Sequence, residues 1–400
     1  MNIDVHKAFA EVSREKDPYF RQYTHDAPMI MSHETYFRTK QLGKILHKAI
    51  GYFVGNYRSF LHVMPLDERT LEILKICEKY PFRINSYRTD FVINKQREIK
   101  IIEMTTRFPL NGYMSSGFLR NIGQGMADVL KLNGIIDDYP RFLNFLQNDF
   151  ALTGKITAIK GKDRMNDFKL YSLIFPKANI DFRVIELDEL EYKIDLLKGA
   201  RVISELNQQE IKSLANRHID ALAALGVFND FRNIFLIHDK RFFKLLTDPA
   251  FLDAALSAEE QKILSTFTIP SYTLPGDKAF FEEAYARKDN WILKPHLLGK
   301  GEGVVAGQAV SEEDWKKLFE TGQVQSMILQ SMVEQPLFPG TIGKEIRNDY
   351  VVGTLLYLDN DYYGPGEYRA SSFCVTNQGD HRKKAQIVAE REERFADITI

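Results

Sequence analysis

The chain has 400 residues, 44% of them apolar, which is enough for two or three structural units that each bury a core. Its 53 basic and 54 acidic side chains give a net charge of -1, and this balance excludes attraction to nucleic acid or to an anionic membrane by charge alone. The first residues lack an apolar segment behind a basic region, and no run of about 20 apolar residues occurs, so we expect a cytoplasmic protein.

Residues 1–84 are predicted to form a helical N-terminal layer, because apolar residues between 35 and 80 recur at helical spacing. Residues 85–150 are predicted to open with a β-hairpin and to continue with helices of the same core. The hairpin is indicated by apolar runs at 90–93 and 99–102 with a polar stretch between them.

Residues 151–230 alternate between strand and helix patterns. A βαβ order predicts a parallel sheet, and hence a small Rossmann-like substrate domain. No G-x-G-x-x-G motif follows the first strand, so dinucleotide binding is poorly supported. The second helix is expected to end at Gly226 in the C′ position. The expected strands are 155–159, 182–185 and 200–203, and the expected helices are 163–175 and 209–225.

Residues 231–388 are predicted to form an α+β nucleotide-binding core, followed by a C-terminal tail at 389–400. Glycine and proline are concentrated between residues 295 and 366, which is typical of working loops. The predicted fold class is therefore a combination of α+β and α/β. The expected strands are 234–237, 241–246, 291–294, 303–306, 327–330 and 350–357, and the expected helix is 257–265.

A strand that ends in a lysine and is followed by glycines is the strongest single signal. Lys294 ends an apolar strand, and glycines at 299, 301 and 303 follow it at alternate positions. The ammonium can meet phosphate oxygens, and backbone without Cβ atoms can approach them, so the segment resembles a phosphate-covering flap. The alternative is a surface hairpin with a glycine-rich turn.

Two neighbouring segments fit the same ligand. Lys240, expected at the end of another strand, offers a second cation for phosphates. Residues 329–333 run from a strand into a polar loop, a hinge whose backbone groups could pair with an adenine edge. Taken singly, each is also compatible with an ordinary surface lysine or core strand.

Asp90 and Glu103 lie on the two strands of the predicted hairpin, which can bring both carboxylates to one end of the sheet. Such oxygen ligands suit Mg²⁺ that bridges nucleotide phosphates. The alternative is a pair of solvated charges. The two cysteines, Cys77 and Cys374, are too few for a disulfide framework and lack C-x-x-C spacing, and we expect buried or incidental thiols.

Together these segments resemble the ATP-grasp superfamily, in the circularly permuted order of eukaryotic glutathione synthetase and the synthetase domain of glutathionylspermidine synthetase. In most of the superfamily the metal-binding hairpin comes after the glycine-rich flap, whereas here Asp90 and Glu103 come before it. The resemblance covers residues 85–375. It implies an ATP-grasp fold in permuted order, with a Rossmann-like unit before the nucleotide core and a helical N-terminal layer.

The resemblance also implies roles for individual residues. Thr105 stands where the family usually has Asn, and its hydroxyl is a weaker ligand, while His296 and Leu297 replace an acidic residue that some permuted members carry. Glu302 lies further along the flap and is not assigned as a ligand. The implied metal ligands are Asp90, Glu103 and Thr105; the implied nucleotide contacts are Lys240, Lys294, Gly299, Gly301, Gly303, Gln330, Met332 and Val333; and the implied catalytic arginines are Arg88 and Arg369.

The implied activity is an ATP- and Mg²⁺-dependent ligase that activates a carboxylate as an acyl phosphate and joins it to an amine. Its expected partners are a small carboxylic acid and an amine of amino-acid or peptide-like type, without nucleic acid or membrane, and a homodimer is allowed. Two other functions stay open: a small-molecule kinase, and a non-catalytic nucleotide-binding protein that has lost a metal ligand at Thr105. Candidates for binding a substrate carboxylate, each also compatible with an ordinary surface position, are Arg107, Asn111, Arg347 and Arg369.

Overall fold

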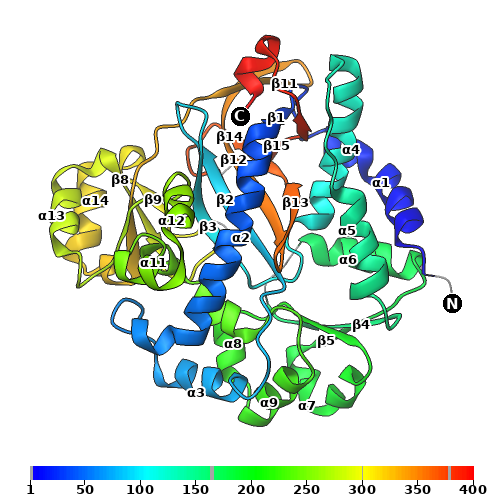
Figure 1. Ribbon diagram of the computed structural model, residues 1–400, viewed down its shortest axis with the longest axis vertical. Helices are drawn as coiled ribbons and strands as arrows, with labels where there is room; N and C mark the ends of the chain where they lie inside the picture. Colours follow the sequence, from blue (N-terminus) through cyan, green and yellow to red (C-terminus); the bar gives the residue numbers. More distant parts are fainter. Residues whose placement is uncertain (1–2, 163–165, 300, 377–379) are drawn as a thin grey trace.

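The computed structural model describes residues 3–162, 166–299, 301–376 and 380–400, and Figure 1 shows their arrangement. The helices are α1 (Val5–Arg21), α2 (His33–Asn56), α3 (Glu68–Cys77), α4 (Tyr113–Leu130), α5 (Tyr139–Phe145), α6 (Asn166–Lys177), α7 (Leu190–Lys193), α8 (Gln208–Ser213), α9 (Asn216–Ala224), α10 (Phe242–Leu245), α11 (Pro249–Ala255), α12 (Ala258–Ser265), α13 (Lys278–Ala286) and α14 (Glu312–Glu320). The strands are β1 (Met29–Ser32), β2 (Ser86–Ile93), β3 (Ile99–Thr105), β4 (Lys155–Lys160), β5 (Asp181–Glu186), β6 (Arg201–Ser204), β7 (Ser271–Tyr272), β8 (Trp291–Pro295), β9 (Val305–Ala306), β10 (Met327–Ser331), β11 (Phe338–Ile342), β12 (Glu345–Leu358), β13 (Asp361–Pro365), β14 (Tyr368–Ser371), β15 (Arg382–Lys384) and β16 (Gln386–Ala389).

A seven-stranded sheet forms the centre of the molecule, with the path β15-β14-β12-β2-β3 and with β11 and β13 also paired to β12. The predicted hairpin is confirmed as β2–β3, and it is joined to β12 by antiparallel pairing. The long helix α2 crosses one face of this sheet (Figure 1). At the crossing, Gly43 packs on Tyr357 so closely that a Cβ would lie 2.3 Å from the ring, which is why a glycine stands in this helix.

The two faces of this sheet have different side chains, because successive residues of a strand point to opposite sides. Phe91, Ile101 and Leu355 belong to the main hydrophobic core together with α2. Asp90 is next to Phe91 on β2, and Val352 is three positions before Leu355 on β12. Both therefore face the other side of the sheet. The opposite face carries the polar side chains at the Asp90 end, while further along β12 Leu356 and Leu358 on that face pack into a second hydrophobic core.

The three-stranded sheet has the order β5-β4-β6 with parallel pairing, which confirms the predicted βαβ unit. Residues 163–165 of the first predicted helix lie outside the described residues, and α6 continues from Asn166. The predicted helix 209–225 is wrong as a single element, because Leu214 and Ala215 are extended and separate α8 from α9. Arg69 donates to the carbonyls of Lys212 and Leu214 at this break, which compensates the lost helical hydrogen bonds.

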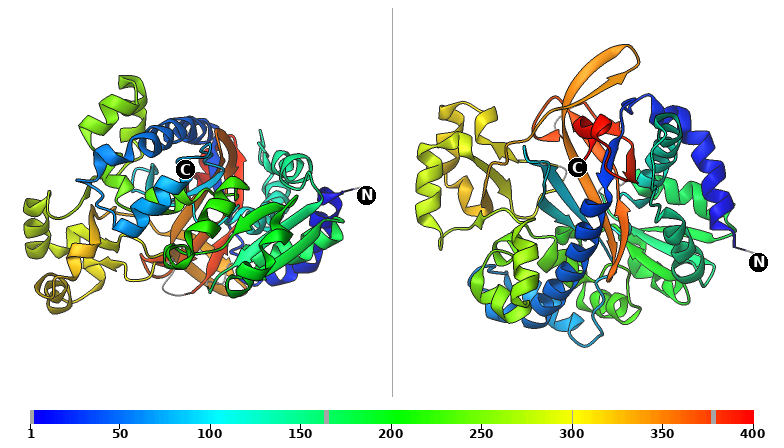
Figure 2. Two further views of the ribbon diagram at one scale, coloured as in Figure 1. Left: turned by 90° about the horizontal axis from the view of Figure 1, so that it is seen from below. Right: turned by 45° about the horizontal axis from the view of Figure 1, so that its top comes forward.

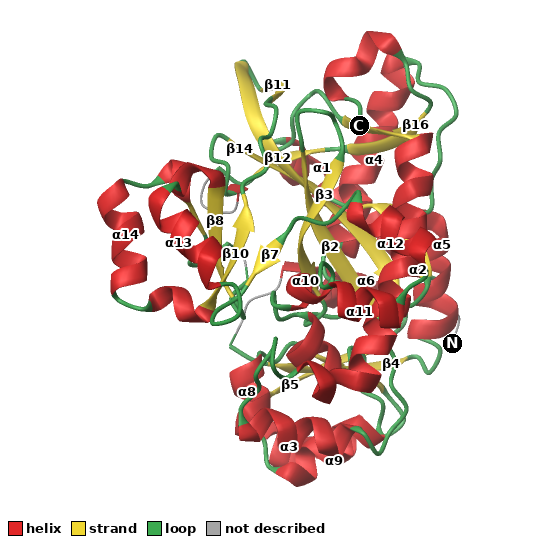
Figure 3. Cartoon of the chain, turned by 60° about the vertical axis from the view of Figure 1, so that its left-hand side comes forward, coloured by secondary structure: helices red, strands yellow, loops and turns green. Residues whose placement is uncertain are grey.

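A small lobe carries the four-stranded sheet β7-β10-β8-β9, with α13 and α14 on it, at one side of the molecule (Figure 3). The lobe has its own core, separate from that of the central sheet. The predicted strands 291–294 and 327–330 are confirmed as β8 and β10, whereas only Val305–Ala306 of the predicted strand 303–306 is a strand. The core includes Phe281, Trp291, Leu293, Trp315 and Leu329.

The strands predicted at 234–237 and 241–246 are wrong. Residues Asn233–Ile237 form a π-helical turn and Phe242–Leu245 form α10. Residues 234–237 are all buried, and a short apolar run buried on every side does not distinguish a strand from a helix. Lys240 therefore lies in the turn between two helical segments rather than at a strand end.

The last residues are built into the fold. Strand β16 pairs in parallel with β1, and the Ile400 amide donates to the Ile30 carbonyl at 2.9 Å. The β11–β12 hairpin extends beyond the central sheet (Figure 2). In the described residues we find no helix with the length and apolarity needed to cross a membrane. The fold is thus a mixed α+β architecture with several sheets, and the domain limits given above remain a prediction.

Candidate functional site

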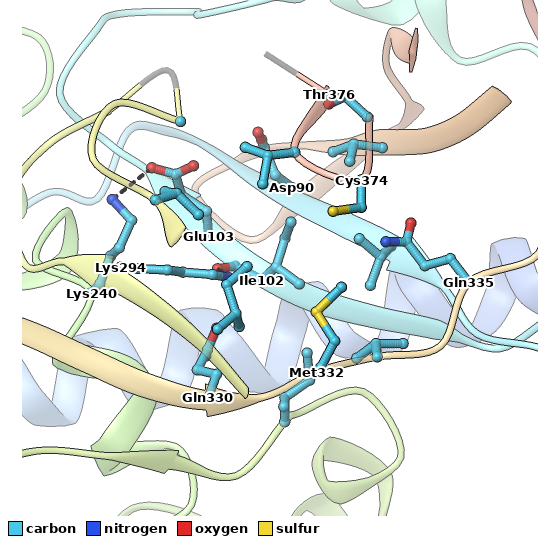
Figure 4. Close-up of a pocket in the computed structure, with 18 of the residues that line it drawn as sticks. Asp90, Ile102, Glu103, Lys240, Lys294, Gln330, Met332, Gln335, Cys374 and Thr376 are labelled. Carbon is cyan, nitrogen blue, oxygen red and sulfur yellow. Dashed lines mark hydrogen bonds and ion pairs between the residues drawn. The ribbon is translucent and has the colours of Figure 1, made fainter. Parts of the chain in front are cut away.

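A cavity of about 720 Å³, part of it open to solvent, lies between the polar face of the central sheet and the small lobe (Figure 4). The central sheet contributes side chains from β2, β3, β12 and β14, and the lobe contributes β8, β10 and the loops that follow them. The lining residues are Asp90, Val92, Ile102, Glu103, Lys240, Ile269, Ile292, Lys294, Gly301, Val304, Gln330, Ser331, Met332, Val333, Gln335, Val352, Arg369, Cys374, Val375 and Thr376.

The hairpin β2–β3 places two carboxylates side by side at the cavity. Asp90 and Glu103 are direct cross-strand partners. The pairing then shifts, so that Phe91 faces Ile101 and Ile102 is the extra residue of a bulge. Because of this bulge, Ile102 and Glu103 both line the cavity although they are neighbours in sequence.

Asp90 is held by two arginines and is only 2% exposed. Arg88 donates to it from Nε at 2.7 Å and from Nη2 at 3.2 Å, and Arg369 forms a further ion pair with its Oδ2. Arg88 also donates to Asn111. The carboxylate is therefore fixed in place by guanidinium groups that converge from β2 and β14.

Glu103 forms an ion pair with Lys240, whose Nζ lies 3.0 Å from Oε1. Burial by itself would raise the pKa of Glu103, but Lys240, followed by Lys294 and Arg369, outweighs burial and lowers this pKa below its ordinary value. The Lys240 ammonium also donates to the Leu298 carbonyl in the flap. Lys240 thus connects the carboxylate of the central sheet to the flap of the lobe.

Lys294 extends from β8 into the same space, with 6% of its surface exposed. Its Nζ donates to the Ile102 carbonyl at 3.2 Å. Burial, reinforced by the charge of Lys240 and opposed by Glu103 and Asp90, lowers the pKa of Lys294 to about 8. An ammonium has three donors, so this arrangement leaves capacity for an anion.

Gln330 on β10 ends the apolar side of the cavity, which Ile292, Met332 and Val333 help to form. Its Nε2 donates to Ser271 Oγ at 2.7 Å, and Ser271 Oγ in turn donates to the Ile269 carbonyl at 3.0 Å. Because the hydroxyl proton is already donated to this carbonyl, the Ser271 oxygen can only accept, so the amide nitrogen of Gln330 must face it. This leaves Gln330 Oε1 as a buried acceptor without a partner in the described structure.

The hinge and the flap are only partly available to a ligand in this conformation. The Met332 amide donates to the Asn290 carbonyl at 2.7 Å, so it is already used. In the flap, the Lys240 amide donates to the His296 carbonyl at 2.9 Å. Gly301 lines the cavity, whereas Gly299 and Gly303 do not. Lys300 lies outside the described residues.

Comparisons with known proteins agree with this geometry. Residues 40–236 match the family model described as the AnkG N-terminal domain. The chain is 26% identical over 201 residues to the ATP-grasp enzyme ankG of Aspergillus thermomutatus, an alignment covering 45% of this chain and 39% of that protein. It therefore spans about two fifths of the length of this curated relative. These similarities support an assignment to the ATP-grasp, glutathione synthetase-like superfamily.

A solved structure has a similar fold. The glutathione synthetase-like effector GSS30 of Globodera pallida, in its apo form, superposes with a TM-score of 0.53. The identity is 12%, and the match covers 95% of this chain and 96% of that one. The similarity in fold thus extends over nearly all of the chain.

Most of the residues that the superfamily resemblance selects converge on the cavity. Thr105 is opposite Arg88 in the β2–β3 register and does not line it, and Arg88 lies behind Asp90. Among the weaker candidates, Arg347 is paired with Glu345 on the β11–β12 hairpin and Arg107 stacks on the Phe108 ring. The residues brought together are Asp90, Glu103, Lys240, Lys294, Gly301, Gln330, Met332, Val333 and Arg369.

Sequence reasoning missed part of the cavity. The expectation that both cysteines are buried or incidental is confirmed as burial for Cys77, which is 1% exposed, whereas Cys374 is partly exposed and lines the cavity. Cys374 is in the loop after β14, a segment without motif or periodicity. Gln335 was missed for the same reason. Only the tertiary fold brings such loop residues to the site.

Proposed function

We propose that the chain is an ATP-dependent ligase that forms an amide bond between a small carboxylic acid and an amine, with release of ADP and phosphate. The observation that carries the proposal is the convergence of Lys240, Lys294, Arg369, Asp90 and Glu103 on one cavity, although they belong to five separate segments of the chain. Few other substrates need cations, carboxylates and an apolar slot together.

The charges of the cavity suit a nucleotide triphosphate. Among the described lining residues, three cations stand against two carboxylates, and Arg88 adds a further cation behind Asp90. Phosphate oxygens would complete the hydrogen bonding of the buried Lys294 ammonium. The apolar side would take the base, and Gln330 Oε1 would accept from an exocyclic amine.

Asp90 and Glu103 fit a Mg²⁺ ion, because Mg²⁺ is commonly held by one or two carboxylates together with substrate phosphates and water. Among the described residues, no group of three His, Cys, Asp or Glu side chains could hold a metal, so phosphate and water oxygens must complete the coordination. When bound, Mg²⁺ would neutralise negative charge on the transferring phosphoryl group. Thr105 is not part of this donor set, because it lies outside the cavity lining.

The proposed reaction needs positioning and charge stabilisation rather than a protein nucleophile. An oxygen of the acid attacks the γ-phosphorus of ATP, ADP leaves, and the amine then displaces phosphate from the acyl phosphate. Lys294 and Lys240 neutralise the phosphates, and Arg369, steadied with Arg88 around Asp90, faces the group being transferred. The flap excludes water that would hydrolyse the acyl phosphate.

Three further features belong to this proposal. The ATP-grasp elements occur in circularly permuted order, since the β2–β3 hairpin precedes the lobe with the flap. The acid and the amine are of amino-acid or peptide-like type. The reaction takes place in the cytoplasm.

The test uses hydroxylamine as a general amine, because it traps acyl phosphates as hydroxamates whatever the natural amine is. The full chain is incubated with ATP, Mg²⁺ and each member of a panel of amino acids and dicarboxylic acids. We expect acid-dependent ADP release and hydroxamate, and with an ¹⁸O-labelled acid we expect one ¹⁸O atom in the released phosphate. Nucleotide binding without hydroxamate for any acid would overturn the ligase, and phosphate retained on an acceptor would identify a kinase.

A further inference from the structure

The two thiols of the chain have opposite environments. Cys77 is in the main core, and burial, with a smaller contribution from Asp230, raises its pKa to about 12. Cys374 is partly exposed and lines the cavity. In Figure 4 its sulfur points into the cavity, on the side of Asp90 and Gln335. A thiol with a raised pKa in an apolar core is inert, so Cys374 is the thiol that reagents can reach.

The loop that carries Cys374 is anchored where it leaves β14. Asp380 accepts from the Ser372 amide at 2.9 Å and from the Ser372 hydroxyl at 2.7 Å, and the Phe373 amide donates to Ser371 Oγ at 3.1 Å. These contacts fix the start of the loop at the end of β14. Residues 374–376 then line the cavity directly after it.

An independent feature marks this cavity as a ligand site. Gln330 is fully buried and lines the cavity, and its Oε1 has no partner in the described structure. A buried acceptor without a partner is unfavourable, and a bound donor would remove that cost. Cys374 and Gln330 both line this cavity, at opposite sides of it in Figure 4, so an adduct on the thiol would take up part of the space that a ligand of Gln330 needs.

We propose that Cys374 is a covalent modification site inside the nucleotide cavity, protected when nucleotide is bound and blocking nucleotide when modified. This rests on the proposed function, because it takes the cavity to be the nucleotide site. The substrate class is a low-molecular-weight disulfide. The Cys374 sulfur attacks one sulfur of the disulfide, that S–S bond breaks as the new one forms, and the second half leaves as a thiol that takes the Cys374 proton. A thiol reductant reverses the reaction.

The first experiment counts adducts on the native full chain. Iodoacetamide at neutral pH should add one group, mapped to Cys374, and two groups once the protein is denatured. Cys77→Ala is the matched control and should keep the single native adduct, whereas Cys374→Ser should have none. Labelling of Cys77 before Cys374, or no native labelling, would overturn the proposal.

The second experiment links the adduct to nucleotide. Bis(2-hydroxyethyl) disulfide is the disulfide probe, and nucleotide binding is measured by calorimetry before and after treatment. ATP with Mg²⁺ at about 100 times its dissociation constant should slow labelling by roughly 100-fold, the factor that simple competition gives. The mixed disulfide should weaken ATP binding at least tenfold, and dithiothreitol should restore it.

The outcomes separate the two proposals. If calorimetry shows ATP binding but labelling is not slowed and the adduct leaves affinity unchanged, the modification site is wrong and the nucleotide cavity stands. If the untreated protein binds no ATP while Cys374 still labels, the proposed function fails and the thiol is reactive without nucleotide control. The second result also refutes the protection that this inference states.

Discussion

Glu103 and Lys240 form a largely buried ion pair that joins β3 to a turn next to the flap. Because Glu103 is a proposed Mg²⁺ ligand, a change of this side chain alone should affect catalysis. Glu103→Gln keeps an oxygen that can accept from Lys240 but removes the charge that would hold Mg²⁺. We expect turnover to fall more than ~100-fold, because metal and cation clamps on phosphoryl groups supply several kcal/mol of transition-state stabilisation. The melting temperature should also fall, because Lys240 and Lys294 lose the negative charge that faces them, so turnover is compared at a temperature where both proteins are folded.

The control for this variant is Glu98→Gln, on the exposed turn of the same hairpin, where Glu98 accepts from Asn94. It changes the same charge outside the cavity, so turnover should be that of the parent chain. Full activity in Glu103→Gln would remove the metal assignment, whatever the fold of the variant.

Lys294 gives the site a pH dependence that can be measured without knowing the substrates. Its pKa is lowered from 10.5 to about 8, so the free protein loses this charge between pH 8 and 10.5 while the unfolded chain keeps it. Over that window the unfolded state binds more protons, and Lys294 makes the free energy of unfolding rise with pH. Binding of an anion has the opposite effect on Lys294, because the anion favours the charged form of the ammonium.

ATP affinity should therefore be constant below about pH 8 and fall by up to about tenfold per pH unit above it. Lys294→Met should bind ATP roughly 10- to 100-fold more weakly, as expected for one lost charge-assisted hydrogen bond, and its affinity should not change across that range. Calorimetry from pH 7 to 9.5 measures both. A parent affinity that stays level up to pH 9.5 would contradict the placement of Lys294 against the phosphates.

At the scale of single residues, the sequence predicted those site residues whose positions are fixed by local geometry. Asp90 and Glu103 were predicted together because a short turn between two strands fixes which residues are neighbours. The free acceptor of Gln330 depends on a hydrogen bond from Ser271 to a backbone carbonyl, and the position of Cys374 depends on a loop. Neither has a periodic signature, so tertiary structure was needed for both.

The glycines of the flap differ in how strictly their positions require a glycine. Gly303 has a φ of +67°, and a Cβ there would lie 2.8 Å from Pro295 Cγ, whereas a Cβ on Gly299 would meet nothing within 4 Å. Gly303→Ala should thus cost about 1–2 kcal/mol in the described flap conformation, and Gly299→Ala should cost much less. The sequence pattern alone gave both glycines the same weight.

Hydrogen exchange measures this difference. The described flap residues, 296–299 and 301–304, have few backbone hydrogen bonds to the rest of the described chain, so their amides should exchange quickly without nucleotide and slowly with an ATP analogue and Mg²⁺. Gly303→Ala should lose most of that protection at Glu302 and Val304, whose amides donate to Gly299 and Gly301. Equal protection in the Gly303 and Gly299 variants, or none in the parent chain, would refute the flap assignment.

Elements with a local sequence signal were predicted well, and elements defined by tertiary contacts were not. The strands β8 and β10 are short apolar runs of strand length, and the helix α12 begins at a capping serine, Ser257. The helical turns at 233–245 are buried on all sides, so their apolar run has no distinguishing period. The break between α8 and α9 depends on Arg69, which comes from another part of the chain.

At the scale of the whole molecule, the central sheet and the small lobe have separate cores and meet at the cavity. Lys240 bridges them, since it contacts both Glu103 and the Leu298 carbonyl. A nucleotide in the cavity would contact both parts at once, and should stabilise them as one unit. The lobe is therefore the part whose stability depends most on ligand.

We expect native-state hydrogen exchange without nucleotide to show lower opening free energies for β8 and β10 than for β2 and β12, because the lobe has the smaller core. ATP analogue with Mg²⁺ at about 100 times its dissociation constant should raise the values of the lobe by up to about 2.7 kcal/mol and bring them closer to those of the central sheet. Lys294→Met should reduce this increase to about 0.4–1.4 kcal/mol at the same ligand concentration, because binding that is 10- to 100-fold weaker leaves the ligand at about 1 to 10 times the dissociation constant of the variant. If nucleotide protects β2 and β12 but leaves β8 and β10 unchanged, it binds to the central sheet alone, and the cavity between the two parts is not the nucleotide site.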